Sequence, residues 1–351
     1  MSREVPESSG VLPCSAREAY FSVRSSRHCG GATVTVLITG GMGFIGLHTA
    51  RAFVDAGEDV VITYYQTWRE PDFIKNEFDK RVKVEKVDVT DRDGLLALGK
   101  KYDITNIVHL AVTGLGAFDA IGDMRVNLNG LMNIMEAATT WEVDRIGLAS
   151  SIAIYSSLAG GPFKEDVSLP IYGVGNPTET YKKTFEIVGG HIGARSNLEV
   201  INLRIGGIWG PLYHSMANLP SRLVHAAVKG MDPKLAEGRG GVPFAEDQAD
   251  FCYVKDCAQG LTKITTAETL AHKTYNISSG RGARNQDLVD AINKVIPEAK
   301  FDLQPGNGPG SRKDPYGDLS QSKADVGYEP AFTLDSAVAD YIGWLRAGNA
   351  Q

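Results

Sequence analysis

Residues 34–46 read Val-Thr-Val-Leu-Ile-Thr-Gly-Gly-Met-Gly-Phe-Ile-Gly, an apolar, β-branched run that passes directly into a glycine-rich turn. Helical spacing of apolar residues continues from His48 to Ala56, and residues 59–64 then have the composition of a second strand. A strand, a glycine turn and a helix in this order indicate a dinucleotide cradle, because the free N–H groups and the positive dipole at the helix start face the pyrophosphate.

The glycines of this turn have separate roles. Gly40 and Gly41 allow the chain to turn tightly. Gly43 leaves out a side chain that would block the pyrophosphate, while Gly46 lets the helix pack closely on the strand. The residues of this segment that we expect at the cofactor are Gly40, Gly43, Phe44, Ile45 and Gly46.

The composition excludes several classes of protein. The chain has 351 residues and a net charge of −6 with no basic cluster, which argues against a nucleic-acid or anionic-membrane partner. No apolar run approaches the roughly 20 residues that a membrane-spanning helix needs. The cysteines at positions 14, 29, 252 and 257 form neither a disulfide framework nor a zinc-ligand spacing, so we expect no metal site and a reducing, cytoplasmic location.

Strand-like and helix-like segments alternate along the following 140 residues. The further strands are predicted at 82–88, 104–111, 145–151 and 199–205, and the further helices at 91–101, 126–140 and 177–195. This alternation indicates parallel βαβ units with ligands at the carboxyl ends of the strands. The predicted fold class is α/β, with a Rossmann-type doubly wound parallel sheet and a smaller C-terminal substrate lobe.

The pattern divides the chain into three regions. Residues 1–32, rich in Ser, Arg and Gly, are expected to form a disordered and dispensable tail, with a transit peptide as the alternative. Residues 33–205 form the predicted dinucleotide-binding domain, to which segments near 250–280 return. Residues 206–348, where Pro, Gly and short elements interrupt the spacing, are expected to form most of the substrate lobe.

Short motifs follow one another in a recognisable order. They are Val87-Asp88-Val89-Thr90-Asp91, His109-Leu110-Ala111-Val112, the helix pattern of Asn127, Asn129, Gly130 and Asn133, Ala149-Ser150-Ser151 with Tyr155, Trp209-Gly210-Pro211, Tyr253-Val254-Lys255-Asp256, and Gly327-Tyr328-Glu329-Pro330. Together with the glycine turn, these motifs resemble those of the extended short-chain dehydrogenase/reductases, the NAD-dependent epimerase/dehydratase family, over about residues 34–347.

This resemblance implies an enzyme that transfers hydride reversibly at a secondary alcohol or ketone of a sugar-like or small hydroxylated substrate. It also implies a homodimer formed through the helices predicted at 126–140 and 177–195. His109 is interpreted as a packed core histidine. The further residues that the resemblance places at the cofactor are Asp88, Val89, Leu110, Ala111, Val112 and Asn127.

The preference between NAD and NADP is weakly marked in the sequence. Family members usually carry Asp or Glu at the end of the second strand, where it binds the adenosine ribose of NAD, but Tyr64 stands there. Arg69, a few residues later, is the candidate to reach the 2′-phosphate of NADP. The habit of the family favours NAD, and both Tyr64 and Arg69 are cofactor candidates.

The catalytic pattern of the family is present only in part. In the family, a Ser or Thr polarises the reacting oxygen and a Tyr exchanges its proton. A Lys four residues later binds the nicotinamide ribose and lowers the pKa of the Tyr. Ser151 fits the first position, and Lys182, four residues before Glu186, fits the last. Thr178 stands at the Tyr position, so the Tyr-x-x-x-Lys motif is absent.

Three explanations are open for the missing phenol. Tyr181, about one helical turn after Thr178, or Tyr172, in the preceding loop, replaces it. Alternatively, Thr178 or a bound water serves in its place. In the third explanation, the protein is a catalytically silent dinucleotide-binding regulator.

The substrate lobe lacks one anchor of the family. Ala249 precedes Asp250-Phe251, at a position where nucleotide-sugar members usually carry an Arg that holds the diphosphate. Asn218-Leu219-Pro220 resembles the segment that closes over the nucleotide, and Arg312 is a candidate to bind an anionic group. A nucleotide sugar and a smaller hydroxylated or carbonyl molecule are therefore both candidate substrates.

Overall fold

The computed structural model describes residues 34–114, 117–172, 176–238 and 241–349, so the predicted N-terminal tail lies outside the described residues. Its centre is a seven-stranded parallel sheet in the order β10-β6-β5-β4-β1-β2-β3. This order confirms the predicted Rossmann-type sheet. Its strands are β1 (Thr35–Thr39), β2 (Asp59–Tyr64), β3 (Val82–Lys86), β4 (Asn106–His109), β5 (Arg145–Ser151), β6 (Glu199–Ile205) and β10 (Thr274–Ile277).

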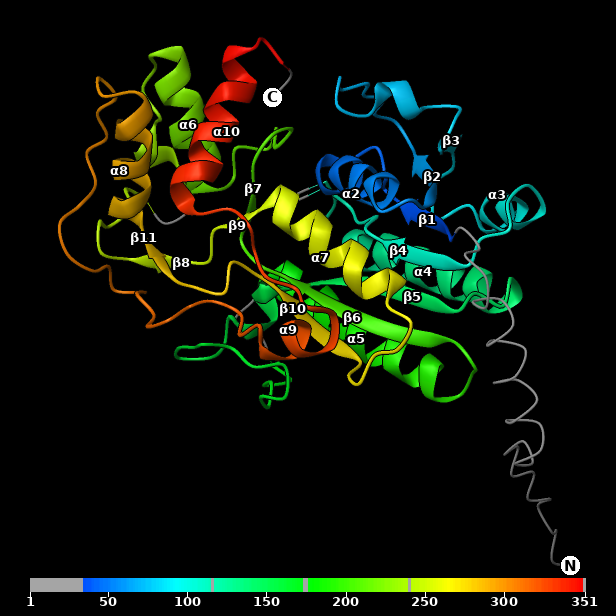
Figure 1. The fold of residues 1–351 in the computed structure, drawn as a ribbon. Coiled ribbons are helices and arrows are strands. Elements are labelled where there is room, and N and C mark those ends of the chain that lie inside the picture. Colours follow the sequence, from blue (N-terminus) through cyan, green and yellow to red (C-terminus); the bar gives the residue numbers. More distant parts are fainter. Residues whose placement is uncertain (1–33, 115–116, 173–175, 239–240, 350–351) are drawn as a thin grey trace, which may run out of the picture.

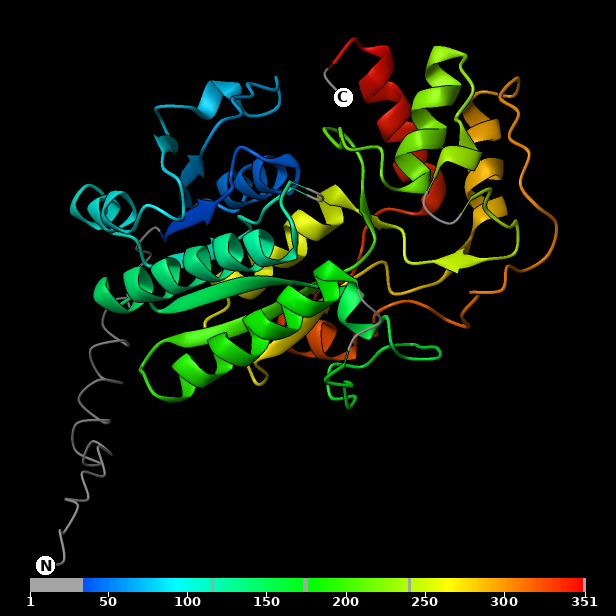
Figure 2. The same cartoon turned by 180° about the vertical axis from the view of Figure 1, so that it is seen from behind.

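Helices cover both faces of the sheet (Figures 1 and 2). Side chains alternate along β1, so Val36 and Ile38 join the apolar cluster on one face and Leu37 joins the cluster on the other. None of the helices within the described ranges is long and apolar enough to cross a membrane. The first face is covered by α2 (Phe44–Asp55) and α7 (Val254–Thr266), and the second by α3 (Arg92–Ala97), α4 (Ala120–Thr140) and α5 (Pro177–Ala194).

The element boundaries differ from the predicted ones where side chains end or begin a helix or strand. The third strand ends at Lys86 rather than at residue 88, because the Asp88 side chain accepts a hydrogen bond from the amide of Thr90 and forms a turn. Helix α4 begins six residues earlier than the predicted 126–140, because Asp119 caps it by accepting from the amide of Gly122. Asn176 caps α5 by accepting from the amide of Thr178 at 3.0 Å.

A second lobe lies beside the carboxyl edge of the sheet and is built mainly of helices (Figures 1 and 2). Its core packs the rings of Trp209, Tyr253 and Tyr341 among aliphatic side chains. The remaining elements are β7 (Ile208–Trp209), α6 (Leu219–Lys229), β8 (Gln248–Ala249), β9 (Cys252–Tyr253), β11 (Ala283–Arg284), α8 (Asn285–Val295), α9 (Ser320–Val326), α10 (Leu334–Arg346) and the 3-10 turns Lys75–Glu77, Leu98–Lys100, Ile152–Tyr155 and Leu235–Glu237.

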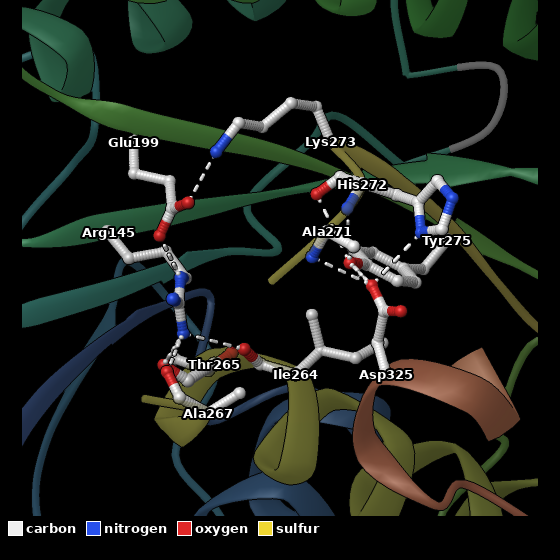
Figure 3. A network of polar contacts seen from close by, with 10 residues as sticks. All are labelled: Arg145, Glu199, Ile264, Thr265, Ala267, Ala271, His272, Lys273, Tyr275 and Asp325. Carbon is white, nitrogen blue, oxygen red and sulfur yellow. Dashed lines mark hydrogen bonds and ion pairs between the residues drawn. The ribbon is translucent and has the colours of Figure 1, made fainter. Parts of the chain in front are cut away.

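Arg145 fastens the amino edge of the sheet to the end of α7 (Figure 3). Its Nη1 donates to the carbonyl oxygens of Ile264, Thr265 and Ala267, which lie at the carboxyl end of α7. Its Nε pairs at 2.6 Å with Glu199, whose other oxygen pairs with Lys273. A cation at a helix carboxyl end satisfies carbonyl groups that the helix itself leaves without partners. This network fixes the edge opposite the one where the cofactor is expected.

Candidate functional site

The glycine turn forms an open cradle between β1 and α2. Gly40 has φ +66°, a left-handed conformation that favours glycine. A Cβ on Gly41 would lie 2.5 Å from the Ile62 side chain, and a Cβ on Gly46 would lie 2.5 Å from the backbone of Gly41. These two glycines are therefore required for packing.

Gly43 differs because its missing side chain leaves open space. A Cβ built there would have only the Gly40 carbonyl oxygen within 4 Å among the described atoms, at 3.0 Å. Gly43 is also the N-cap of α2, where no described side chain caps the helix. The amides of Phe44 and Ile45 therefore face this space without intrahelical partners. A pyrophosphate fits such a helix start, so the residues present fit a dinucleotide cofactor.

The adenosine end of the cradle has no carboxylate at the end of β2. Tyr64 stands there half-buried, with its ring 5.2 Å from that of Trp68. Arg69 donates through Nη1 to the carbonyl oxygen of Met42 at 3.0 Å, so its guanidinium lies beside the glycine turn. Val89 packs against Gly130 of α4, next to the turn that Asp88 forms. Tyr64, Arg69, Asp88 and Val89 thus lie along one edge, where the sequence predicts the adenosine.

The residues after β4 form a braced loop at the same edge. The amide of Leu110 donates to the Thr39 carbonyl, and the amide of Ala111 donates to the Thr39 hydroxyl at 3.3 Å. Asn127 accepts from the amide of Thr113 at 3.0 Å and donates to its hydroxyl at 2.9 Å. Asn127 therefore holds the loop that contains Ala111 and the exposed Val112.

Lys182 lies deep at the carboxyl ends of β4 and β5. Its Nζ donates to the carbonyl oxygen of Ala149 and lies 5.3 Å and 5.2 Å from the ring centroids of Tyr181 and Phe185. Burial lowers the pKa of the ammonium from 10.5 to about 7, against an opposing effect of the Glu186 carboxylate. Lys182 is therefore a cation that the protein environment stabilises only weakly.

Ser151 ends β5, two residues beyond the carbonyl that Lys182 binds. Its Oγ accepts from the amide of Ala153 at 3.1 Å, which starts the following 3-10 turn. The hydroxyl hydrogen of Ser151 is not used in that bond, so it can be donated to a substrate oxygen. Ser151 thus lies two residues after the carbonyl oxygen that Lys182 binds, and the catalytic roles of both residues stay predictions from the sequence.

The tyrosine candidates lie in contrasting environments. Tyr172 is 89% exposed on the loop before α5. Tyr181 is 6% exposed and belongs to the apolar cluster between the sheet and α4. Burial raises the pKa of its phenol, and a hydrogen bond with Thr178 opposes this shift. Thr178 itself lies one turn before Lys182 on α5.

His109 also lies beside this site, with its ring centroid 6.1 Å from that of Phe185. His109 shares a 2.7 Å hydrogen bond through Nδ1 with Thr39, and its buried Nε2 has no hydrogen-bond partner among the described residues. Burial, and secondarily the charge of Lys182, lower the pKa of His109 to about 3, so its ring is neutral. The sequence indicates that His109 is a core residue, and its 1% exposure agrees with that. The sequence does not predict that its Nε2 lacks a partner among the described residues.

Sequence reasoning also missed a polar network behind Ser151. Glu186 accepts from Ser150 and forms a bidentate pair with Arg204, at 3.0 and 2.8 Å. Arg204 donates to the Tyr155 hydroxyl at 2.8 Å, and that hydroxyl donates to Asn276 at 2.9 Å. Ser150 and Tyr155 belong to one of the sequence motifs, but only the fold shows that this motif binds Glu186, Arg204 and Asn276.

Arg312 is a basic residue close to the 3-10 turn that follows Ser151. Arg312 donates through Nη1 to the Tyr155 carbonyl at 3.3 Å, and its guanidinium lies 5.6 Å from the Phe163 ring centroid. Asp250, next to Ala249, accepts from Ser278 at 2.6 Å and from the Ser279 amide at 2.9 Å. Its carboxylate is therefore engaged within the protein.

Comparison with known families decides the relationship. The model of the NAD dependent epimerase/dehydratase family matches residues 36–278, which is more than half of the chain. The chain belongs to this family. The expectation of an NAD-dependent enzyme of the extended short-chain type is thereby confirmed. The family's cofactor fits the open space at Gly43 and the start of α2.

Curated relatives and solved structures agree with this assignment. The UDP-glucose 4-epimerase of Bacillus subtilis is 24% identical, covering 89% of this chain and 96% of its own. The UDP-glucuronate 4-epimerase of Thermodesulfobacterium geofontis is 22% identical, covering 88% and 95%. The fold is similar to that of a dTDP-glucose 4,6-dehydratase from Bacillus anthracis in complex with NAD, with a TM-score of 0.75, 19% identity and coverage of 90% and 97%. A UDP-glucose 4-epimerase of Thermotoga maritima with UDP-glucose gives a TM-score of 0.74 at 17% identity, covering 90% and 99%.

Proposed function

We propose that this chain transfers hydride reversibly at a secondary alcohol or ketone carbon of a nucleotide-linked sugar. The observation that carries the proposal is the pairing of the open cradle at Gly43 with Ser151 and Lys182 at the end of β5. The relatives named above act on nucleotide sugars, and this chain covers almost their whole length. Membership of the family and this arrangement support the same chemistry.

The proposed roles follow from the positions of the side chains. NAD, when bound in the cradle, supplies the hydride acceptor and donor. Ser151 donates its hydroxyl hydrogen to the reacting oxygen and orients it. Lys182 binds the nicotinamide ribose through its ammonium hydrogens and keeps the reacting carbon near the ring.

Arg312 supports a nucleotide sugar over a small neutral substrate. Its guanidinium is half-buried beside the loop that follows Ser151, and burial lowers its pKa, so an anionic ligand would stabilise it. Ala249 removes the second arginine that nucleotide-sugar members usually carry. We therefore expect a diphosphate to be held by one arginine, with weaker affinity than two would give.

Turnover of a substrate panel tests this function. The full chain is incubated with NAD and UDP-glucose, UDP-glucuronate or dTDP-glucose, and with the corresponding free sugars, and products are separated by chromatography. We expect conversion of at least one nucleotide sugar and none of the free sugars. Conversion of free sugars alone would contradict the nucleotide requirement.

A matched pair of arginine variants tests the role of Arg312. Arg312→Gln should weaken UDP binding roughly tenfold or more, because it removes a charge-assisted contact. Arg92→Gln is the control, since Arg92 pairs with Glu136 on the exposed surface of α3 and α4. Calorimetric titration with UDP measures both variants, and equal affinities would remove Arg312 from the site.

The silent regulator is the second candidate, and the replacement of the family's tyrosine by Thr178 favours it. It predicts tight NAD binding with no conversion of any nucleotide sugar or free sugar. The same substrate panel distinguishes the two candidates.

A further inference from the structure

The phenols near the site are poorly placed to exchange a substrate proton. The Tyr155 hydroxyl is held by Arg204 and Asn276, and burial raises its pKa to about 12. The Tyr181 ring lies in an apolar cluster and its pKa is raised as well. Tyr172 is 89% exposed and has no described cation against its hydroxyl. A phenol needs a cation near its oxygen to act as a base at neutral pH. Arg204 supplies one to Tyr155, but the Tyr155 hydroxyl donates its hydrogen to Asn276, and burial outweighs the effect of the cation on its pKa.

The Lys182 amine has the opposite properties. An ammonium has three N–H donors, and the described hydrogen bond to Ala149 uses one. Two aromatic rings border Nζ at 5.3 and 5.2 Å, and the side chain is 6% exposed. A buried ammonium with so few hydrogen bonds is destabilised relative to the neutral amine. Lys182 is thus the amine of this site that can lose and regain a proton.

We propose that Nζ of Lys182 exchanges the substrate proton directly, taking the place of the tyrosine that Thr178 replaces. This inference rests on the proposed function. In the oxidative direction, the substrate C–H bond breaks and its hydride reduces NAD, while the O–H bond breaks and its proton passes to the neutral amine. The alcohol becomes a ketone and the amine becomes an ammonium. The reverse direction returns both.

The groups around Lys182 are compatible with this exchange. His109 on β4 is neutral, so it adds no second positive charge. Glu186, one turn further along α5, favours the ammonium, but Arg204 on β6 pairs with its carboxylate. Asp123 on α4 accepts from the Thr113 hydroxyl and influences Tyr181 rather than Lys182. The balance leaves the pKa of Lys182 at about 7, near the value that suits a general acid and base at neutral pH.

Lys182→Arg separates this role from binding of the ribose. A guanidinium retains a positive charge and several donors, but it does not lose its proton at neutral pH. We expect Lys182→Arg to bind NAD by calorimetry nearly as well as the parent protein. Turnover should fall roughly 10²- to 10⁴-fold, as loss of a general acid and base implies.

Chemical rescue gives a readout that a purely structural role would not move. In Lys182→Ala, added methylamine should restore turnover in proportion to the concentration of its free base.

In the full parent chain with ¹⁵N-labelled lysine, nuclear magnetic resonance should record one amine that titrates near neutral pH and disappears in Lys182→Arg. This titration needs neither substrate nor turnover.

The outcomes distinguish a failure of the proposed function from a failure of the proposed proton transfer by Lys182. If the parent protein converts a nucleotide sugar and Lys182→Arg retains its rate, the proposed function stands and Lys182 is not the proton carrier. Loss of turnover in Tyr181→Phe, together with an active Lys182→Arg, would assign the proton to the phenol and overturn the inference. If the parent protein converts no substrate, the proposed function fails and the inference fails with it.

Discussion

At the residue scale, the buried ammonium of Lys182 lowers the free energy of unfolding. Its ordinary pKa is 10.5 and its pKa in the fold is about 7, with burial as the main cause. Below pH 7 the ammonium is charged in both the folded and the unfolded chain, and the full cost of burying it opposes folding. Between pH 7 and 10.5 only the unfolded chain binds the proton, so the free energy of unfolding rises with pH in this window.

This linkage predicts the behaviour of Lys182→Met. The variant should be more stable than the parent protein at about pH 6, and its advantage should shrink as the pH rises to about 9. The loss of the hydrogen bond to Ala149 does not depend on pH, so it changes the free energy of unfolding of the variant equally at pH 6 and pH 9. Denaturant unfolding at the two pH values measures the difference. A constant difference would show that Lys182 keeps its ordinary pKa in the fold.

Substitutions at two glycines of the cradle should have different effects, one on NAD binding and the other on the packing of the fold. Gly43→Val should abolish NAD binding and leave the fold intact, because its side chain enters the open space at the start of α2. Gly46→Ala is the matched packing variant, since its Cβ would lie 2.5 Å from Gly41 and force the backbone to shift. Calorimetry and thermal unfolding distinguish the two. Unchanged NAD affinity in folded Gly43→Val would contradict the cradle.

The sequence predicts some of these residues better than others, for a physical reason. Gly43 and Gly46 act within a local strand-turn-helix unit, so their spacing alone indicates their roles. Lys182 and Ser151 were found through a family pattern. The burial of Tyr181 and the unpaired Nε2 of His109 depend on packing between β4, α4 and α5, and no local pattern predicts that.

At the element scale, Arg145 connects parts of the chain that are far apart in sequence. It belongs to β5, yet it caps the carboxyl end of α7 and pairs with Glu199 of β6 (Figure 3). The alternating segments predicted the parallel sheet, because each βαβ unit is local. They did not predict this contact, which spans more than 100 residues.

Arg145→Met should therefore destabilise the protein by about 3–5 kcal/mol, the usual effect of removing one partner of a buried ion pair. It also leaves the carbonyl groups at the end of α7 without their donor. Lys273→Met is the control, because Lys273 pairs with the same Glu199 from an exposed position and should cost about 1 kcal/mol or less. Denaturant unfolding compares them, and equal losses would refute the capping role.

At the scale of the whole molecule, the family resemblance predicts a C2 dimer through α4 and α5. Both helices carry exposed apolar side chains, with Ile121 of α4 and Ile187 of α5 each 69% exposed. An interface through these helices would bury both side chains in a four-helix arrangement. The exposed apolar side chains of α4 and α5 therefore support a dimer.

Ile187→Glu should convert the dimer to a monomer in sedimentation velocity experiments at micromolar concentration, because it introduces a charge into the interface. Met231→Glu is the control, since Met231 is 59% exposed in the other lobe, away from α4 and α5. A parent protein that sediments as a monomer would reject the dimer.

Transfer of deuterium tests the central claim, hydride transfer to bound NAD, most directly. The protein is loaded with NAD and mixed with UDP-glucose or UDP-glucuronate deuterated at the reacting carbon, quenched rapidly, and its nicotinamide is analysed by mass spectrometry. We predict that deuterium appears on the nicotinamide ring in the parent protein and not in Gly43→Val. A product formed with no deuterium on the nicotinamide, or no product from any nucleotide sugar, would contradict the account.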